Sequence, residues 1–255
     1  MYTRTGHLPS RPPAVARRHA ARMAQPRRFG YGLGANTSRG RKSAMTDQQI
    51  GLFDALYTQR AIRSLKPDPV PEALLHRMVE AATKAPSGGN SQPWAFIVVR
   101  DMATIAKIAE YAKRGFAPVY EAALGRMKPG DPPPFPRLKP LVESFERVPA
   151  IVFPAWVRPA NAQPGAGGAS LYPATQNLLL AARGLGLGAA MTSIALGFQK
   201  ELKELLGVPE HVELMATIPV GYPNKERYGK TTRKPAHEVT HWDRWGNQHP
   251  APAGG

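Results

Sequence analysis

The sequence contains no cysteine among its 255 residues. This absence excludes disulfide bonds, thiolate metal ligands and a cysteine nucleophile, and it is compatible with a reducing compartment, so we expect a cytoplasmic protein. No apolar run approaches the roughly 18–20 residues that a membrane-spanning helix needs. The apolar fraction of 42% is ordinary for a globular protein and predicts a substantial hydrophobic core.

Acidic residues are absent from the first 45 positions, which hold ten of the 34 Lys and Arg residues. The other 24 basic residues face 18 acidic ones, so most of the net charge of +16 belongs to this segment. The segment is rich in Arg, Pro, Gly and Ala and has no sustained apolar period. This composition predicts a disordered basic tail over residues 1–45 and a single folded domain over residues 46–255.

The basic tail leaves a second class of function open. The chain could be a nucleic-acid-binding protein that acts through residues 1–45 and uses the folded part as a scaffold. Its salt-dependent binding should then disappear when the tail is removed. No folded nucleic-acid-binding module accompanies the tail, so nucleic acid is not the expected partner. The tail also resembles a transit peptide, although Pro12, Pro13 and Pro26 interrupt its weak amphipathic pattern.

Downstream of the tail, segments with helical periodicity alternate with short continuous apolar runs. The first helix, 47–59, is expected to bury one face that carries Ile50, Phe53, Leu56 and Tyr57. Further helices are expected at 71–85, 101–114, 138–147 and 198–206, and strands at 94–100, 150–157, 189–194 and 213–220. Another helix is expected to follow the glycine-rich residues 165–168 and to be ended by the glycines of 184–188. The first strand lacks alternation, which predicts a central position in the sheet. This order predicts one domain of the α/β or α+β class, and the family resemblance described below favours α+β with a central sheet flanked by helices.

Residues 86–93 join a helix to the first buried strand and consist of two prolines, two glycines and four small polar residues. Pro and Gly fix a backbone that is neither helix nor strand. The polar side chains and free N–H groups can meet a planar ligand with polar edges at close range. Composition alone still favours a plain connector, because such loops are common.

The segments 59–67 and 85–100 together resemble the signature of the nitroreductase family, whose members bind flavin mononucleotide (FMN). The resemblance implies a homodimer with a central mixed sheet and with FMN held in a cleft between the subunits. It also implies NADH or NADPH as the reductant and a nitroaromatic or quinone compound as the acceptor, in a ping-pong cycle. The same superfamily includes flavin-fragmenting and halogen-removing members, which share the fold and the FMN site.

Arg60 and Arg63 are three residues apart beside the end of a helix, so both guanidinium groups can face one anion. Read alone, two solvated surface arginines are the simpler interpretation. The resemblance maps the FMN phosphate onto this segment, which also contains Ala61, Ile62 and Ser64. Gln59 stands where the family has its first arginine, and Ala61 stands where serine is common.

The resemblance places further segments around the flavin, and we nominate no catalytic acid or base, because the flavin N5 atom carries the chemistry. A backbone N–H near N5 can steady the flavin when it is reduced. The flavin ring and ribityl chain are expected to meet Pro86, Ser87, Gly88 and Asn90 from one subunit. The N5 edge is expected to meet Ser193 and Ile194, with Met191 and Thr192 adjacent. Arg233 is expected to complete the phosphate site.

Two other patterns in the sequence carry less weight. Residues 237–241 read His-Glu-Val-Thr-His, the zinc-protease pattern, but no helical context surrounds them, so we predict no metal site. The proline-rich stretch 129–140 lies in the irregular region 115–147, where the family resemblance is weakest. We expect its neighbouring aromatic residues to shape the acceptor pocket: Phe116, Tyr120 and Phe135.

Overall fold

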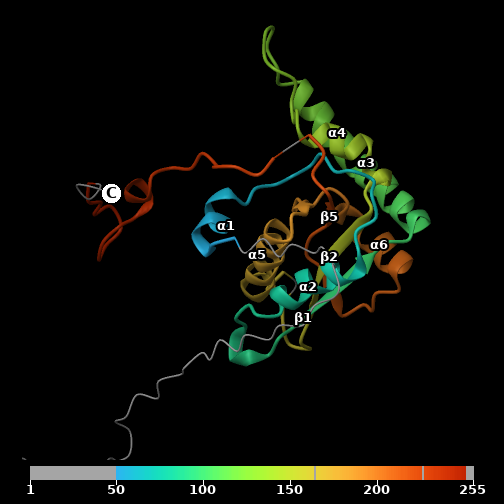
Figure 1. The fold of residues 1–255 in the computed structure, drawn as a ribbon, viewed down its shortest axis with the longest axis horizontal. Coiled ribbons are helices and arrows are strands. Elements are labelled where there is room, and N and C mark those ends of the chain that lie inside the picture. The colour runs from blue at the N-terminus through green and yellow to red at the C-terminus, as the bar shows by residue number, and fades with distance from the viewer. Residues whose placement is uncertain (1–49, 164, 226, 251–255) are drawn as a thin grey trace, which may run out of the picture. The chain divides into compact units, whose positions relative to one another are not determined.

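The computed structural model describes residues 50–163, 165–225 and 227–250, shown as a ribbon in Figure 1. The tail and the domain boundary at residue 45 lie outside the described residues, so both stay predictions. No helix in the described part is long and apolar enough to cross a membrane.

The centre of the fold is a sheet whose described strands pair antiparallel in the order β1-β2-β5-β3, with β4 also pairing with β2. Its strands are β1 (Trp94–Val99), β2 (Ala150–Val157), β3 (Gly188–Ala189), β4 (Val212–Leu214) and β5 (Ile218–Gly221). β2 is buried along all but its last residue, because it has strands on both sides and helices on both faces. Both layers of the core therefore pack against β2.

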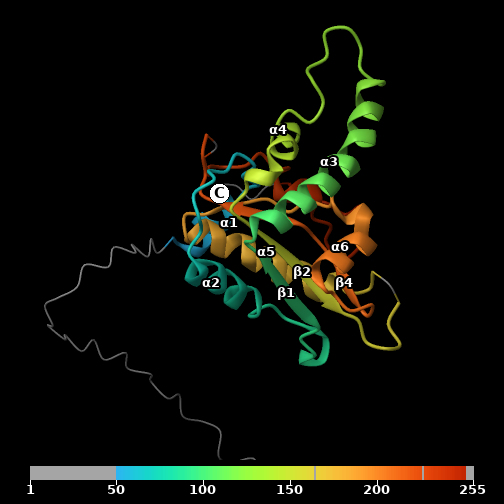
Figure 2. The same ribbon diagram turned by 90° about the vertical axis from the view of Figure 1, so that its right-hand side faces the viewer.

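Helices cover the sheet on both faces (Figure 2). One layer consists of α2 (Glu72–Ala82) and α5 (Gly168–Gly184). The other consists of α3 (Met102–Leu124), α4 (Leu138–Glu143), the 3₁₀ turn Phe145–Arg147 and α6 (Gln199–Leu206). Each layer closes its own hydrophobic cluster, which is the arrangement expected for an α+β domain. The predicted fold class is confirmed.

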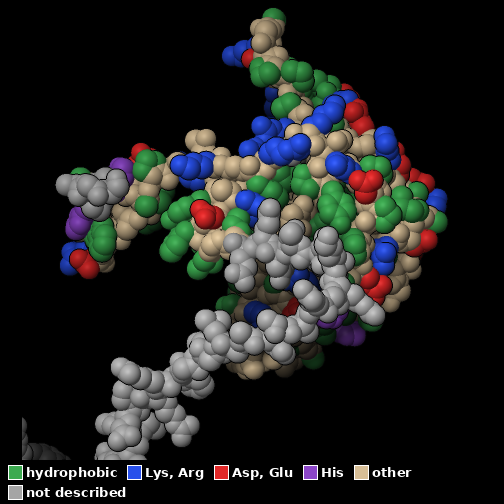
Figure 3. All heavy atoms as spheres, in the orientation of Figure 1, with side chains coloured by type: hydrophobic (Ala, Val, Ile, Leu, Met, Phe, Trp, Pro, Cys, Tyr) green, Lys and Arg blue, Asp and Glu red, His purple; other side chains and the backbone are tan. Residues whose placement is uncertain are grey.

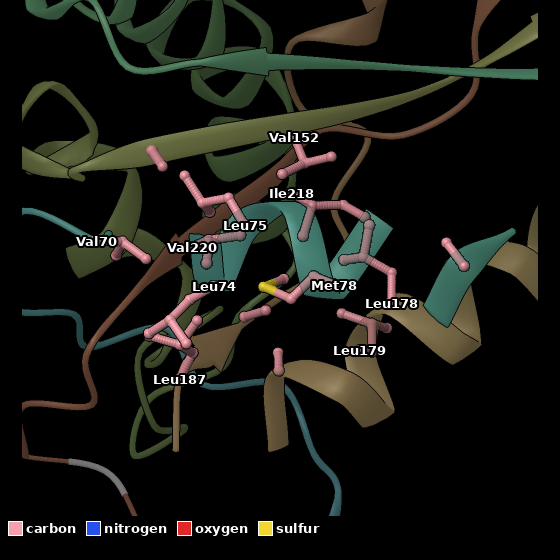
Figure 4. Close-up of a cluster of buried hydrophobic side chains, with 14 of the residues drawn as sticks. Val70, Leu74, Leu75, Met78, Val152, Leu178, Leu179, Leu187, Ile218 and Val220 are labelled. Carbon is pink, nitrogen blue, oxygen red and sulfur yellow. The ribbon is translucent and has the colours of Figure 1, made fainter. Parts of the chain in front are cut away.

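Figure 4 shows the first cluster, in which side chains from α2, α5 and the sheet meet. The helical spacing in α2 brings Leu74, Leu75 and Met78 to one face, and all three are buried. They pack against Leu178 of α5 and against side chains from β2 and β5. The apolar period seen in the sequence therefore becomes the contact surface between helix and sheet.

Several predicted elements differ from the structure. The strand expected at 189–194 is only the two-residue β3, and Thr192 further on forms an isolated bridge to Thr217. The helix expected at 138–147 ends at Glu143 and is followed by a 3₁₀ turn. β1 lies at the edge of the described sheet, with Val98 exposed, so its expected central position is wrong. α3 does not end near residue 114 but continues through Pro118 to Leu124, because Phe116 is still buried, with its ring against those of Tyr120 and Phe135. The strand expected at 213–220 is split, since Met215 N–H already bonds to Pro154 while Thr217 turns to pair with Thr192.

The first helix, α1 (Leu52–Thr58), does not bury its apolar face within the chain. Leu52, Phe53 and Tyr57 are 67%, 65% and 61% exposed, and Ala55 is the buried residue of the helix. The prediction of a buried face is therefore wrong for the single chain, because none of the described core clusters reaches that side of the helix.

We expect Phe153→Ala to lower the free energy of unfolding by about 3–5 kcal/mol, since Phe153 is fully buried in the second cluster and the change leaves a cavity. The measurement is denaturant unfolding at one fixed protein concentration. Val98→Ala is the matched control, because Val98 is 38% exposed on the neighbouring strand and should cost well under half as much. Equal losses for the two variants would contradict this assignment of the core.

Candidate functional site

The arginine-bearing segment is held to the sheet by its backbone. Ile62 N–H donates to Ala189 O of β3 at 3.0 Å, and Lys66 N–H donates to Tyr222 O at 2.8 Å. Ser64 O accepts from Asn224 N–H at 2.9 Å. Ile62 is fully buried, so it anchors the segment while the neighbouring Arg60, Ala61, Arg63 and Ser64 stay partly exposed. The predicted phosphate-binding residues thus lie beside the strand that leads to residues 191–194.

Residues 191–194 follow β3 as an irregular backbone fixed by a pair of bonds to Thr217. Thr192 N–H donates to Thr217 O at 3.0 Å, and Thr217 N–H donates back to Thr192 O at 2.8 Å. Ile194 N–H is already used, because it donates to the Thr192 hydroxyl at 3.1 Å. Within the part of the chain that the structure describes, no acceptor is assigned to Ser193 N–H. Of the two predicted N5 contacts, the backbone therefore favours Ser193 over Ile194.

Helix α3 approaches this segment at Gly115. A Cβ atom built on Gly115 would lie 2.1 Å from Ile194 O, a distance that no real carbon–oxygen contact tolerates. The absence of a side chain at this position therefore permits the helix to pack against the backbone at residue 194. The sequence does not predict this contact. Gly115 lies in the middle of a helix, where its low helix propensity relative to alanine gives no sign of what it packs against.

The loop predicted to meet the flavin forms a 3₁₀ turn, Gly88–Asn90, whose hydrogen bonds are local. Gln92 N–H donates to the Ser87 hydroxyl at 3.0 Å, and Asn90 N–H donates to Ser87 O at 3.0 Å. Asn90 and Gln92 adopt positive φ angles of 54° and 48°, which non-glycine residues rarely hold. Gly88 and Asn90 are exposed, so their backbone and side-chain groups face outward from this chain.

A contact that sequence reasoning missed links three segments of the site. Arg183, in the last turn of α5, donates from Nε to the Thr58 hydroxyl at 3.1 Å, two residues before Arg60. Its guanidinium also lies over the Tyr228 ring, 4.6 Å from the centroid. Tyr228 in turn donates its hydroxyl to Leu187 O, just before β3. One guanidinium therefore ties the end of α1, the entrance to β3 and the C-terminal segment together.

Arg233, the predicted last member of the phosphate site, is exposed. Its Nη1 atom donates to the neighbouring Thr232 O at 2.8 Å. Among the described residues, no bond joins it to the segment 60–64. Within the described part of the chain, the backbone of Ile62 therefore joins the segment 60–64 to β3, whereas Arg233 has no such link, and the joint role of these residues stays a prediction.

The His-Glu-Val-Thr-His sequence forms a 3₁₀ turn, Ala236–Val239, followed by extended backbone at Thr240. The two histidines thus do not share one face of an α-helix, as the zinc-protease pattern requires. His241 is instead engaged in a local turn, where its Nδ1 accepts from Gly246 N–H at 3.0 Å and its ring stacks on Trp245.

The three aromatic residues expected at the acceptor pocket contact one another. The ring centroids of Phe116 and Tyr120 are 5.5 Å apart, and those of Phe116 and Phe135 are 5.8 Å apart with near-perpendicular rings. The proline-rich excursion therefore folds back onto the second half of α3, which extends beyond the sheet (Figure 2). Their role toward an acceptor stays a prediction.

The geometry defines an α+β domain in which the arginine-bearing segment pairs with β3, the strand that leads to residues 191–194. The model of the nitroreductase family matches residues 56–222, well over half of the chain. The chain therefore belongs to the nitroreductase family, a family of oxidoreductase enzymes.

Individual proteins agree with this assignment. A Thermus thermophilus protein named NADH dehydrogenase is 33% identical over 206 residues, covering 74% of this chain and 94% of the relative. The iodotyrosine deiodinase of Thermotoga neapolitana is 29% identical over 174 residues, covering 68% and 89%. Among solved structures, an FMN-dependent nitroreductase of Clostridium difficile aligns with a TM-score of 0.58 at 19% identity, covering 76% of this chain and all of that one, which shows the shared fold.

We expect Gly115→Ala to lower the free energy of unfolding by about 1–3 kcal/mol and to displace residue 194, because the added methyl group meets a backbone oxygen. Chemical denaturation measures the first effect. Gly197→Ala is the control, since nothing lies within 4 Å of a Cβ built there. A stable Gly115→Ala protein would mean that α3 does not pack against residue 194 as described.

We expect Tyr228→Phe to cost about 1 kcal/mol of stability, because Leu187 O loses its donor. Burial raises the pKa of the Tyr228 hydroxyl, whereas an unfolded tyrosine titrates near 10. The contribution of this hydroxyl is therefore complete below about pH 10 and is lost as the pH rises towards the folded-state pKa. Between pH 8 and 11, the free energy of unfolding should fall more steeply with pH for the natural protein than for the variant. Parallel profiles would argue against a buried, protonated Tyr228.

Proposed function

We propose that the protein is an FMN-dependent oxidoreductase that uses NADH or NADPH to reduce a nitroaromatic or quinone-like acceptor. The observation that carries the proposal is the backbone pairing of Ile62 with Ala189. This pairing supports one continuous site in which the guanidinium groups of Arg60 and Arg63 lie beside the free N–H of Ser193. Membership of the nitroreductase family supports the same reaction class.

The donors fit FMN chemically. Arg60 and Arg63 supply planar, charged forks of hydrogen-bond donors, which suit a phosphate. The amide of Ser193 can donate to N5. The Thr192–Thr217 pair holds this main-chain donor in place, so the donor costs no side-chain entropy. FMN, when bound, accepts a hydride from the reduced nicotinamide and passes electrons to the acceptor. The chain's own groups bind and orient; no side chain is assigned a proton transfer.

The proposal includes a homodimer. α1 presents Leu52, Phe53 and Tyr57 to solvent, which is a larger apolar surface than a short helix usually leaves uncovered. The exposed loop Gly88–Asn90 satisfies its hydrogen bonds locally and leaves its outer face available to the flavin of a second subunit. Both features support a site assembled from two chains, with the arginines and the loop contributed by different subunits.

The acceptor is the least determined part of the function. Curated relatives include an iodotyrosine deiodinase, so removal of halogen from an aromatic ring is a second candidate reaction at the same site. The aromatic contacts of Phe116, Tyr120 and Phe135 support an acceptor with a planar ring in either case. Steady-state assays with a nitroaromatic, a quinone and an iodinated phenol distinguish these candidates.

The test of the proposed site is an FMN titration followed by the flavin's fluorescence. We expect Arg60→Ala and Arg63→Ala each to weaken FMN binding by roughly 10- to 100-fold, because each change removes a charged hydrogen-bond donor. The control is Arg126→Ala, which removes an exposed arginine outside the site. Unchanged FMN affinity in both site variants would contradict the assignment of the phosphate to this segment.

Phe135→Ala tests the acceptor side of the site. We expect it to change the ratio of rates for bulky and small acceptors, because the ring packs edge-on against Phe116 and its loss enlarges that side of the excursion. The rate of flavin reduction by the nicotinamide should stay the same. An unchanged ratio in steady-state assays would remove Phe135 from the acceptor pocket.

A further inference from the structure

A second feature lies next to the arginine-bearing segment but away from the other predicted flavin contacts. A cavity of about 420 Å³ opens where α4 faces the chain that follows β5. Its walls come from three stretches far apart in the sequence: residues 63–67, 136–148 and 224–225. It shares Arg63 and Ser64 with the predicted phosphate site, and neither the loop at 86–90 nor residues 191–194 line it.

The cavity is strongly basic. Arg63, Arg137, Arg147 and Lys225 line it, and its described lining contains no aspartate or glutamate. Figure 3 shows Lys and Arg side chains gathered over this part of the molecule. A concave surface with several charges of one sign raises the local concentration of ions of the opposite sign.

The acidic residues of α4 and of the 3₁₀ turn after it pair with lysines that do not line the cavity. Glu146 pairs with Lys113 of α3 at 2.9 Å, and Glu143 pairs with Lys139 one turn earlier in α4. The hydrogen bond from Lys113 holds the pKa of Glu146 below its usual range, so this carboxylate stays ionised and paired. The charge of Arg147 also lowers this pKa, so Glu146 offsets part of the charge of Arg147, whereas neither acid pairs with Arg137.

The remaining lining is apolar and stiff. It consists of Leu65, Pro67, Pro136, Pro140, Leu141 and Val148. Proline rings and branched side chains offer flat surface to an organic body, whereas Ser144 and Asn224 add polar groups near the rim. A free inorganic ion would use the charges and leave this apolar surface unused.

We propose that this cavity is a binding site for an organic anion, in which a phosphate or carboxylate group meets Arg137 and Lys225 while a planar or apolar body lies on the prolines. The site adjoins the candidate flavin site through Arg63. The source of the anion rests on the proposed function. Under that function, the anion belongs either to the 2′-phosphorylated end of NADPH or to a carboxylated aromatic acceptor. The cavity then favours a substrate that carries a negative charge.

The test is calorimetric titration of the full-length protein, saturated with FMN, with four probes. Adenosine 2′,5′-bisphosphate represents the end of NADPH and 4-nitrobenzoate represents a carboxylated acceptor, while adenosine and nitrobenzene are their neutral counterparts. The site variant is Arg137→Ala/Lys225→Ala. The matched control is Arg126→Ala/Lys128→Ala, which removes the same charges from an exposed segment that does not line the cavity.

We expect one anionic probe to bind at least tenfold more tightly than its neutral counterpart, and the site variant to lose roughly tenfold or more of that affinity while the control keeps it. If the site variant loses affinity for the bisphosphate, the natural ligand of the cavity is NADPH. If it loses affinity for nitrobenzoate, the natural ligand is the acceptor. Equal binding of charged and neutral probes, or equal losses in both double variants, overturns the proposal. Loss of FMN binding in the site variant also overturns it, because the cavity would then serve the flavin itself.

The outcome is separable from that of the proposed function. A chain that takes up no FMN would contradict the proposed function, whereas the same titrations on the chain without FMN would still decide whether the cavity prefers an organic anion.

Discussion

The candidate site depends on one backbone pairing, between the segment that follows α1 and the strand β3. The bond from Ile62 N–H to Ala189 O fixes the register, and the fully buried Ile62 side chain makes a one-residue slip costly because it would place an arginine in the core. The register leaves Arg60 and Arg63 partly exposed on either side of the buried Ile62. Arg183 strengthens the arrangement by joining the end of α1, through Thr58, to the Tyr228 ring.

Much of the fold could be predicted because its signals are local. The continuous apolar run of β2 appears in the structure with the expected limits, and α2 begins within one residue of its expected start and ends three residues before its expected end. The sequence failed where packing between distant segments decides the outcome. Helix α3 continues past its expected end because Phe116 finds a buried position, and α1 keeps its apolar face exposed because no described core cluster reaches it.

The candidate site could likewise be predicted where its signals are local and not where distant segments meet. The arginines and the glycine-rich loop carry a pattern that can be recognised in the sequence, whereas the preference for Ser193 over Ile194 depends on a hydrogen bond from Ile194 to the Thr192 hydroxyl. The contact of Arg183 with Tyr228 has no sequence signal, because the residues are 45 positions apart and each is ordinary in its own segment. The basic cavity also escapes a linear reading, since three distant stretches form it. Its position suggests a division of labour, with family-like segments holding the cofactor and the excursion between α3 and β2 selecting the substrate.

The most direct test of the central claim is the absorbance spectrum of the purified full-length protein, recorded without oxygen before and after addition of NADPH. The account predicts the bands of oxidised flavin, either as purified or after incubation with FMN, and their bleaching by the reductant. A protein that stays colourless after incubation with FMN would contradict the account, because the paired segments around Ile62 and Ala189 would then not form a flavin site.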